Sequence, residues 1–294
     1  MIGRCIVGRL VATGSRIRVL TRRNGYAEAG VEPVIGSLGE PGALAALVDG
    51  ADAVFHCAAE INDSARMDEV NIKGTVRLSE AAAAHKVSYF CHISSAGVVG
   101  PGDAAWVDED TPCRPASPYE RSKWEAERRV RAVLGAKTKL CILRPTNVVD
   151  KARPGVLALA LRNGWKEKLV VRIKGAECAH VVHADDVAAA ALHFWGHALD
   201  EPGWFFVASD EDVRNTVAGV YAMCRTEILG VAVGPPATLP ASVPYLVRRV
   251  LRGASLHGRT RFSAARLRAA GFEAPLGLAG AVRQICDRSL AAGR

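Results

Sequence analysis

Apolar and polar positions repeat with two different spacings along the first half of the chain. In residues 2–13, apolar side chains recur at Ile2, Ile6 and Leu10, which is a helical period, and Gly14 can cap that helix. Short apolar runs then predict strands at 16–23, 31–35 and 51–59, with a short helix over 41–50. An alanine-rich helix over 68–86 and a buried strand over 87–100 are predicted next.

The segment SPYERSK, residues 117–123, has the features of a helix start. Ser117 is a good N-cap, Pro118 suits the first helical position, and Glu120 can close a capping box. We expect a helix from here to about Leu134, with Gly135 beyond its end, and then a strand over 138–145. This alternation predicts an α/β fold with a parallel, doubly wound, Rossmann-like sheet over residues 1–150.

The remaining residues, 151–294, are expected to form a small C-terminal substrate-binding part, interleaved with the first domain around 175–210. The composition, 49% hydrophobic and 23% charged over 294 residues, is that of an ordinary globular protein. No apolar run reaches transmembrane length, and the eight cysteines show no paired spacing. We therefore expect a cytoplasmic protein with reduced thiols and no membrane partner.

The positive charge is concentrated at the C-terminal end. From Ala241 onward the chain contains ten arginines, no lysine and only two acidic residues, Glu273 and Asp287. This tail therefore carries the whole net charge of +8. A diphosphate-bearing substrate would explain it, because arginine suits phosphate oxygens, and a solvated basic surface would explain it equally well. A nucleic-acid partner is disfavoured, since no binding motif accompanies the arginines.

Two residues in the predicted 118–134 helix form a candidate acid/base pair. Tyr119 and Lys123 are four residues apart and share one face. A nearby ammonium lowers the pKa of a phenol, so Tyr119 could exchange a proton with a substrate alcohol or carbonyl. The preceding strand delivers Ser94 and Ser95 at its C-terminal end, where ligands of such sheets bind. The simpler alternatives are a chance YxxxK match and two serines in a turn.

The histidines do not predict a metal site. His180 and His183 are three apart in an expected strand, so they should point to opposite faces. His193 and His197 share a helical face, but HFWGH lacks the glutamate of a zinc protease motif. We expect Asp185 or Asp186 to cap the helix that runs to Trp195.

Six short motifs occur in a recognisable order: HCAA at 56–59, VNIKGT at 70–75, HISSAGVVG at 92–100, PYERSK at 118–123, LRPTNV at 143–148 and HADDVA at 183–188. Over residues 1–200 the chain resembles the extended short-chain dehydrogenase/reductases, the NAD-dependent epimerase/dehydratase family. The resemblance implies Ser95 as the group that polarises a carbonyl, Tyr119 as acid/base and Lys123 as a ligand of the nicotinamide ribose. It also implies supporting or cofactor-lining roles for Asn71, which would hold the lysine through water, and for Ala58, Ala59 and Pro145.

The expected cofactor is NADP, with NAD as the alternative. The strand ending at Thr21 is followed by Arg22 and Arg23, where NAD-binding folds usually carry an acid that binds the ribose 2′-hydroxyl. Arginines there accommodate a 2′-phosphate. The family's adenine-side Asp-Leu pair reads Ser37-Leu38 in this chain.

The start of the chain departs from the family pattern. Gly3 matches the third glycine of a TGxxGxxG loop, while the preceding strand and the first two glycines have no counterpart. We expect the chain to be an N-terminally truncated form, which leaves open whether it is active as it stands. The alternative, that residues 5–12 form the strand, gives Arg9 no sensible buried position.

The favoured function is an NAD(P)-dependent oxidoreductase or epimerase acting at an alcohol or carbonyl centre, with a nucleotide sugar as the preferred substrate. Ala96-Gly97 stands where dehydratases of the family carry an acidic pair, and Val99 replaces the family's tyrosine. The alternatives are a ketone or aldehyde reductase resembling dihydroflavonol reductases or 3β-hydroxysteroid dehydrogenases, and a non-catalytic NADP-binding sensor. The sequence leaves homodimer formation open.

Overall fold

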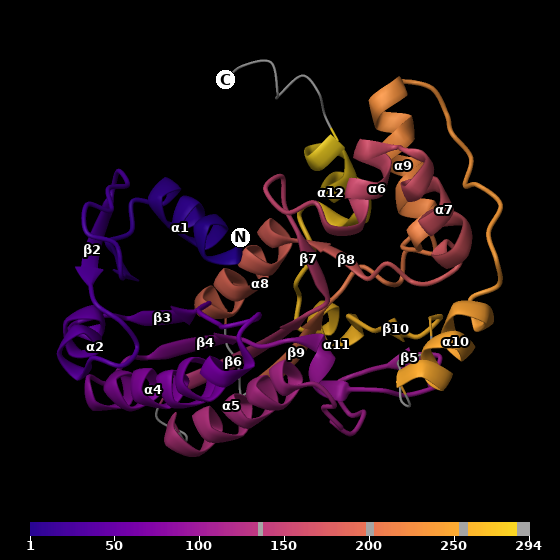
Figure 1. The fold of residues 1–294 in the computed structure, drawn as a ribbon. Helices are drawn as coiled ribbons and strands as arrows, with labels where there is room; N and C mark the ends of the chain where they lie inside the picture. Colours follow the sequence, from indigo (N-terminus) through magenta and orange to yellow (C-terminus); the bar gives the residue numbers. More distant parts are fainter. Residues whose placement is uncertain (135–137, 198–202, 253–257, 287–294) are drawn as a thin grey trace.

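A four-stranded parallel sheet forms the centre of the computed structural model, which describes residues 1–134, 138–197, 203–252 and 258–286. The strand order is β3-β4-β6-β9 (Figure 1), with bounds Ala53–His56, Tyr89–Ile93, Lys139–Pro145 and Gly203–Val207. All five residues of β4 are buried, which explains why this strand reads as an unbroken apolar run. The expected parallel α/β fold is confirmed.

Helices cover both faces of this sheet. Helices α1 (Ile2–Ala12) and α8 (Ala184–Gly196) pack on one face, in a core that also contains Cys91 and Leu143. Helices α2 (Pro41–Val48), α4 (Gly74–Ala84) and α5 (Pro118–Leu134) contribute to the core on the other face. Figure 1 shows α4 and α5 together beneath the strands, with α8 above them.

Several elements match their predicted positions. The helix α1 and the strands β1 (Ile17–Thr21) and β2 (Val31–Ile35) are confirmed, and Gly14 has the positive φ of 71° that follows many helix ends. The helix α5 ends at Leu134 as expected, while Gly135 lies outside the described residues.

Two predicted elements differ in length. The helical segment expected from 68 already starts at Ser64, because the Asp63 carboxylate caps the N–H of Ala65 at 3.1 Å. It runs through α3 (Ser64–Met67), a π-helical turn η1 (Asp68–Lys73) and α4. Within the run 87–100 the strand covers only Tyr89–Ile93. It delivers Ser94 and Ser95 at its C-terminal end as expected, and the chain then turns into the short helix η2 (Ala96–Val99).

A gap separates β1 and β2 from the main sheet. These two strands pair only with each other, and the described residues provide no strand between β1 and β3. A cavity of about 650 Å³ lies there, lined by β1, β3 and the inner side of α1. In the 3-2-1-4-5-6 order of a Rossmann sheet a strand lies at this position, and here the described residues leave a cavity.

The C-terminal part has a second core. It contains the parallel pair β7 (Asn147–Val149) and β8 (Val181–His183), together with apolar side chains of neighbouring helices. The other elements of this region are η3 (Gly155–Leu157), α6 (Ala158–Arg162), α7 (Trp165–Lys174), α9 (Val217–Leu229), α10 (Ser242–Arg252), α11 (Ala265–Ala269), α12 (Gly277–Cys286) and the two-residue strands β5 (Trp106–Val107) and β10 (Arg261–Phe262).

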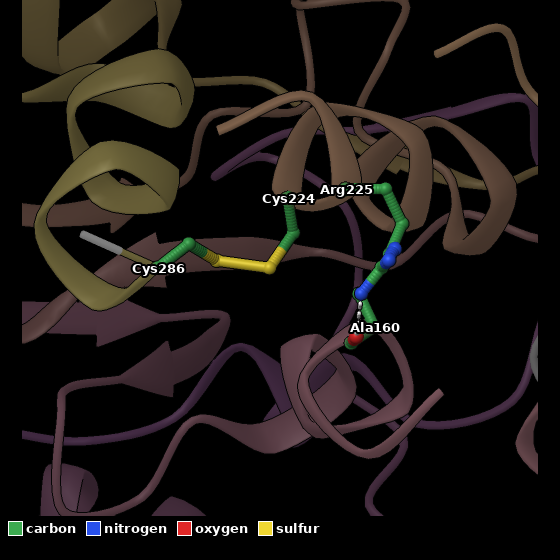
Figure 2. Close-up of a disulfide and its surroundings, with 4 residues drawn as sticks. All are labelled: Ala160, Cys224, Arg225 and Cys286. Atoms are coloured by element: carbon green, nitrogen blue, oxygen red, sulfur yellow. Dashed lines mark hydrogen bonds between the residues drawn. A yellow bond between two sulfur atoms is a disulfide. The ribbon is translucent and has the colours of Figure 1, made fainter. Parts of the chain in front are cut away.

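The expectation that all cysteines are thiols is wrong for one pair. Cys224 of α9 and Cys286 of α12 form a disulfide, and the neighbouring Arg225 donates a hydrogen bond to the carbonyl of Ala160 (Figure 2). The two cysteines are 62 residues apart, so their pairing depends on how the helices pack and cannot be seen in the spacing. Within the described part of the chain, no helix has the length and hydropathy needed to cross a bilayer.

The N-cap of α8 is also different from the prediction. The ring Nδ1 of His183 accepts the N–H of Asp185 at 3.1 Å, so His183 is the cap. Asp185 instead forms a two-bond ion pair with Arg9 of α1, at 2.8 and 2.6 Å. Asp186 accepts the N–H groups of Leu276 and Gly277 at the start of α12. Both carboxylates therefore join α8 to other elements.

Candidate active site

Ser94 and Ser95 follow the last residue of β4, but their surroundings differ. Ser94 is buried; its N–H donates to the carbonyl of Leu143 at 2.7 Å, and its hydroxyl has no partner among the described residues. Ser95 is only half-buried and accepts the N–H of Gly97 at 3.1 Å as the cap of η2. Of the two serines, Ser95 has the hydroxyl that a substrate can reach.

The first turn of α5 is fixed by the predicted capping box. The Ser117 hydroxyl accepts the N–H of Glu120 at 3.2 Å, and the Glu120 carboxylate accepts the N–H of Ser117 at 2.9 Å. Because these bonds fix where the helix begins, Tyr119 lies near its start and Lys123 one turn later.

Tyr119 and Ser95 are brought together by this arrangement. Burial raises the pKa of Tyr119 above its usual value, and an interaction with the Ser95 hydroxyl partly opposes the rise. Burial is the largest influence, so the pKa of Tyr119 is raised here and is not lowered as expected. Lys123 is itself almost fully buried, and desolvation lowers the pKa of its ammonium to about 8 despite the opposing charges of Glu127 and Cys57.

Asn71 supports the same helix by a direct contact. It lies in the π-helical turn and is fully buried. Its amide group donates to the hydroxyl of Ser122 and to the carbonyl of Glu60, both at 2.9 Å, and accepts the N–H of Glu60 at 2.7 Å. Since both amide hydrogens are used, Asn71 holds the neighbour of Lys123 directly.

The expected cofactor residues lie after the ends of parallel strands. Ala58 and Ala59 are exposed just beyond β3, Pro145 is the last residue of β6, and Arg22 and Arg23 are exposed beyond β1.

Three residues expected to contact the cofactor share one cavity. Gly3, Leu38 and Ala58 all line the 650 Å³ space beside β3. A side chain added at Gly3 would meet Cβ of Cys57 at 3.6 Å, so α1 begins close to the end of β3. The exposed Ala58 and Ala59 after β3 leave room for an extended dinucleotide, and the backbone N–H groups at the start of α1 suit its phosphates.

A buried ion pair behind the site was missed by sequence reasoning. Glu127 of α5 and Arg144 of β6 are both buried and form two hydrogen bonds, at 3.0 and 2.7 Å. They directly link the helix that carries Tyr119 and Lys123 to the strand that ends at Pro145. The only signal in the sequence is an arginine inside an apolar strand, which needs a buried acid.

The histidines of β3 and β4 are a second missed feature. His56 and His92 lie opposite each other with ring centroids 5.4 Å apart. His56 shares a 2.8 Å hydrogen bond with Thr75, whereas neither ring nitrogen of His92 has a partner in the described residues. Burial lowers the pKa of both rings, that of His56 to about 3. Both histidines are therefore neutral beneath the site. No group of His, Cys, Asp or Glu in the described ranges could hold a metal ion.

Residues 1–207 match the model of the NAD dependent epimerase/dehydratase family. The chain belongs to this family. Among curated relatives, the family member is 28% identical to the 2-alkyl-3-oxoalkanoate reductase of Shewanella oneidensis, over 86% of this chain and 70% of that protein. It is 32% identical to the UDP-glucose 4-epimerase of Mycolicibacterium smegmatis, over 50% of this chain and 51% of that protein. Several matches, including this one, span only about half of the relative, between 46% and 51%.

Solved structures share the fold over nearly the whole chain. A short-chain dehydrogenase/reductase superfamily protein from Agrobacterium tumefaciens with bound NAD is 25% identical, with a TM-score of 0.68 over 97% of this chain and 93% of that one. The UDP-glucose 4-epimerase of Thermotoga maritima with UDP-glucose is 19% identical, with a TM-score of 0.74 over 100% and 97%. At that identity the second likeness shows the fold alone.

Proposed function

We propose that this family member is an NAD(P)-dependent oxidoreductase or epimerase, with Ser95, Tyr119 and Lys123 as its catalytic residues. The observation that carries the proposal is the contact between Ser95 and Tyr119, which come from separate elements and meet one turn from a buried lysine. A structural role alone would not require an accessible serine and tyrosine above a desolvated ammonium.

The chemistry assigned to these residues is proton transfer. The Ser95 hydroxyl donates a hydrogen bond to the substrate's carbonyl oxygen, and Tyr119 gives that oxygen a proton or removes one from the alcohol. The Lys123 ammonium supplies the positive charge that a developing phenolate needs. When bound, the nicotinamide cofactor supplies or accepts the hydride.

The cofactor is proposed to be NADP. Gly3, Leu38, Ala58, Ala59 and Pro145 would hold it along the strand ends, and the exposed Arg22 and Arg23 would meet a 2′-phosphate. Structural neighbours were solved with NAD, and one, RMD from Pseudomonas aeruginosa, with NADPH. NAD is the alternative.

A nucleotide sugar is the first proposed substrate, and the similarity to UDP-glucose 4-epimerase supports it. A ketone reductase is the second candidate, because the match to 2-alkyl-3-oxoalkanoate reductase extends over 86% of this chain and so includes the C-terminal part. A panel of nucleotide sugars and 3-oxo compounds, with products identified by mass spectrometry, separates epimers from reduced products.

The mechanism is tested by Tyr119→Phe. This change removes only the hydroxyl that exchanges the proton, so turnover should fall by roughly 10²–10⁴-fold while the fold is retained. Turnover is measured with the substrate that the panel identifies, and thermal melting followed by circular dichroism is the control. Full activity in the variant would refute the assignment. Cofactor binding with no turnover of any compound by the wild-type protein would favour the sensor alternative.

A further inference from the structure

Helix α10 exposes an apolar stripe to solvent. Val243, Leu246, Val247, Val250 and Leu251 follow the i, i+3, i+4, i+7, i+8 spacing of one helical face. All five are exposed, and Val250 and Leu251 retain 83% and 76% of their accessible surface. A helix that only packs on its own protein would turn such a stripe inward.

Helix α7 has the same character and lies on the same side of the molecule as α10. It exposes Trp165, Leu169 and Ile173 along one side. The segment that leads into α10 runs along α7, because the N–H of Leu239 donates to the carbonyl of Arg172 at 2.8 Å. Figure 1 shows α7, this segment and α10 on the same side of the molecule. We call these exposed residues of α7 and α10, together with residues 230–241, the α7–α10 face.

Basic residues accompany the apolar stripes. Helix α7 contains Lys166, Lys168, Arg172 and Lys174 against one acid, Glu167, and α10 contains three arginines and no acid. Residues 230–241, which lead from α9 to α10, have no charged side chain. Arg248 is held by Glu177 at 2.5 Å, so the pair also anchors α10 beside the end of α7.

We propose that the α7–α10 face docks on the surface of an anionic lipid bilayer. Amphipathic helices with basic polar sides bind bilayers in this way, with apolar side chains in the headgroup boundary and cations on the lipid phosphates. Trp165 would lie at the depth that tryptophan prefers. A second copy of the chain fits less well, because its own basic face would meet this one. The helices are too short to span, so the contact is peripheral.

Flotation with lipid vesicles tests the proposal. The purified full chain is expected to float with vesicles that contain phosphatidylglycerol, to bind pure phosphatidylcholine vesicles weakly, and to dissociate at high salt. The double variant Val250→Glu/Leu251→Glu should bind anionic vesicles at least about tenfold more weakly. The matched control is Ile35→Glu, an exposed apolar residue on β2 at the other end of the molecule in Figure 1.

Three results would overturn the proposal. One is failure of the wild-type chain to bind anionic vesicles. Another is equal binding by the double variant, with circular dichroism showing that both proteins are folded. The third is a dimer in light scattering that becomes a monomer in the double variant without any vesicle binding, which would show that a second copy covers the face.

Discussion

The burial of one residue of the proposed site, Lys123, lowers the stability of the fold. Its ammonium is almost completely buried, and its pKa falls to about 8 because the charged form loses its hydration. The folded protein therefore holds this proton less tightly than the unfolded chain, in which the pKa is 10.5. Below pH 8 both states are protonated, and folding must bury the charge.

We expect Lys123→Met to stabilise the protein at pH 7 and to abolish turnover. A difference of 2.5 pKa units corresponds to about 3 kcal/mol, and the variant would regain up to this amount. The gain should shrink as the pH rises from 8 to 10.5, because the folded wild-type protein then loses its proton first. Urea denaturation at several pH values measures it, with the exposed Lys151→Met as control. A less stable Lys123→Met at pH 7 would contradict the expectation.

Arg22 and Arg23 allow the proposed cofactor preference to be tested. Both are exposed beyond β1, so alanine at both positions should leave the fold intact. The loss of charged hydrogen bonds to a 2′-phosphate should weaken NADPH binding by about tenfold or more and NADH binding much less. Calorimetry measures both dissociation constants, and Arg16→Ala at the base of the same strand is the control. Equal weakening of the two cofactors would show that these arginines do not distinguish them.

Between elements, the buried Glu127–Arg144 pair fixes the position of α5 on the sheet. Arg144 also lies over the ring of Trp124, 5.6 Å from its centroid, so the guanidinium contacts α5 twice. Glu127 lies one turn beyond Lys123 in α5, and Arg144 directly precedes Pro145 in β6. Its geometry therefore sets the distance between the proposed catalytic turn and the end of β6.

Removing one charge of this pair should be costly. Glu127→Gln keeps the shape but leaves the Arg144 cation buried without a counter-charge, so the free energy of unfolding should fall by about 3–5 kcal/mol. Glu125→Gln on the exposed side of α5, where Arg128 and Arg129 are its partners, should cost about 1 kcal/mol or less. Chemical denaturation measures the free energy of unfolding of both variants. Similar losses would mean that the buried pair has no special role.

The elements that the sequence predicts well are those specified by neighbouring residues. Ser117 and Glu120 identify the start of α5 because a capping box is a local pattern. The cap of α3 by Asp63 is also a local signal, but the sequence does not predict this helix start, because no apolar period follows it directly. The Cys224–Cys286 disulfide and the Arg9–Asp185 ion pair join residues far apart in the chain, so only the packing of the helices reveals them.

Across the whole molecule, the basic tail is distributed over many partners. Arg248 binds Glu177, Arg266 binds Asp110, and Arg268 binds Glu211. The guanidinium of Arg261 donates to the carbonyls of Asp210, Asp212 and Val213. These four arginines therefore hold segments of the C-terminal part together.

The cavity between β1 and β3 also implies that the molecule opens in separate cooperative units. Amides of β4 and β6 have paired strands on both sides, whereas β1 and β2 are bonded only to each other. In native-state hydrogen–deuterium exchange, Ile17–Thr21 should therefore exchange through a local opening, well before Tyr89–Ile93. Mass spectrometry of peptic fragments would measure the two exchange rates. Equal protection of β1 and β4 would show that the cavity does not divide the fold into separate units. If Ile17–Thr21 does exchange first, β1 and β2 form a foldon of their own, and ligands that bridge the cavity should slow the exchange of this pair selectively.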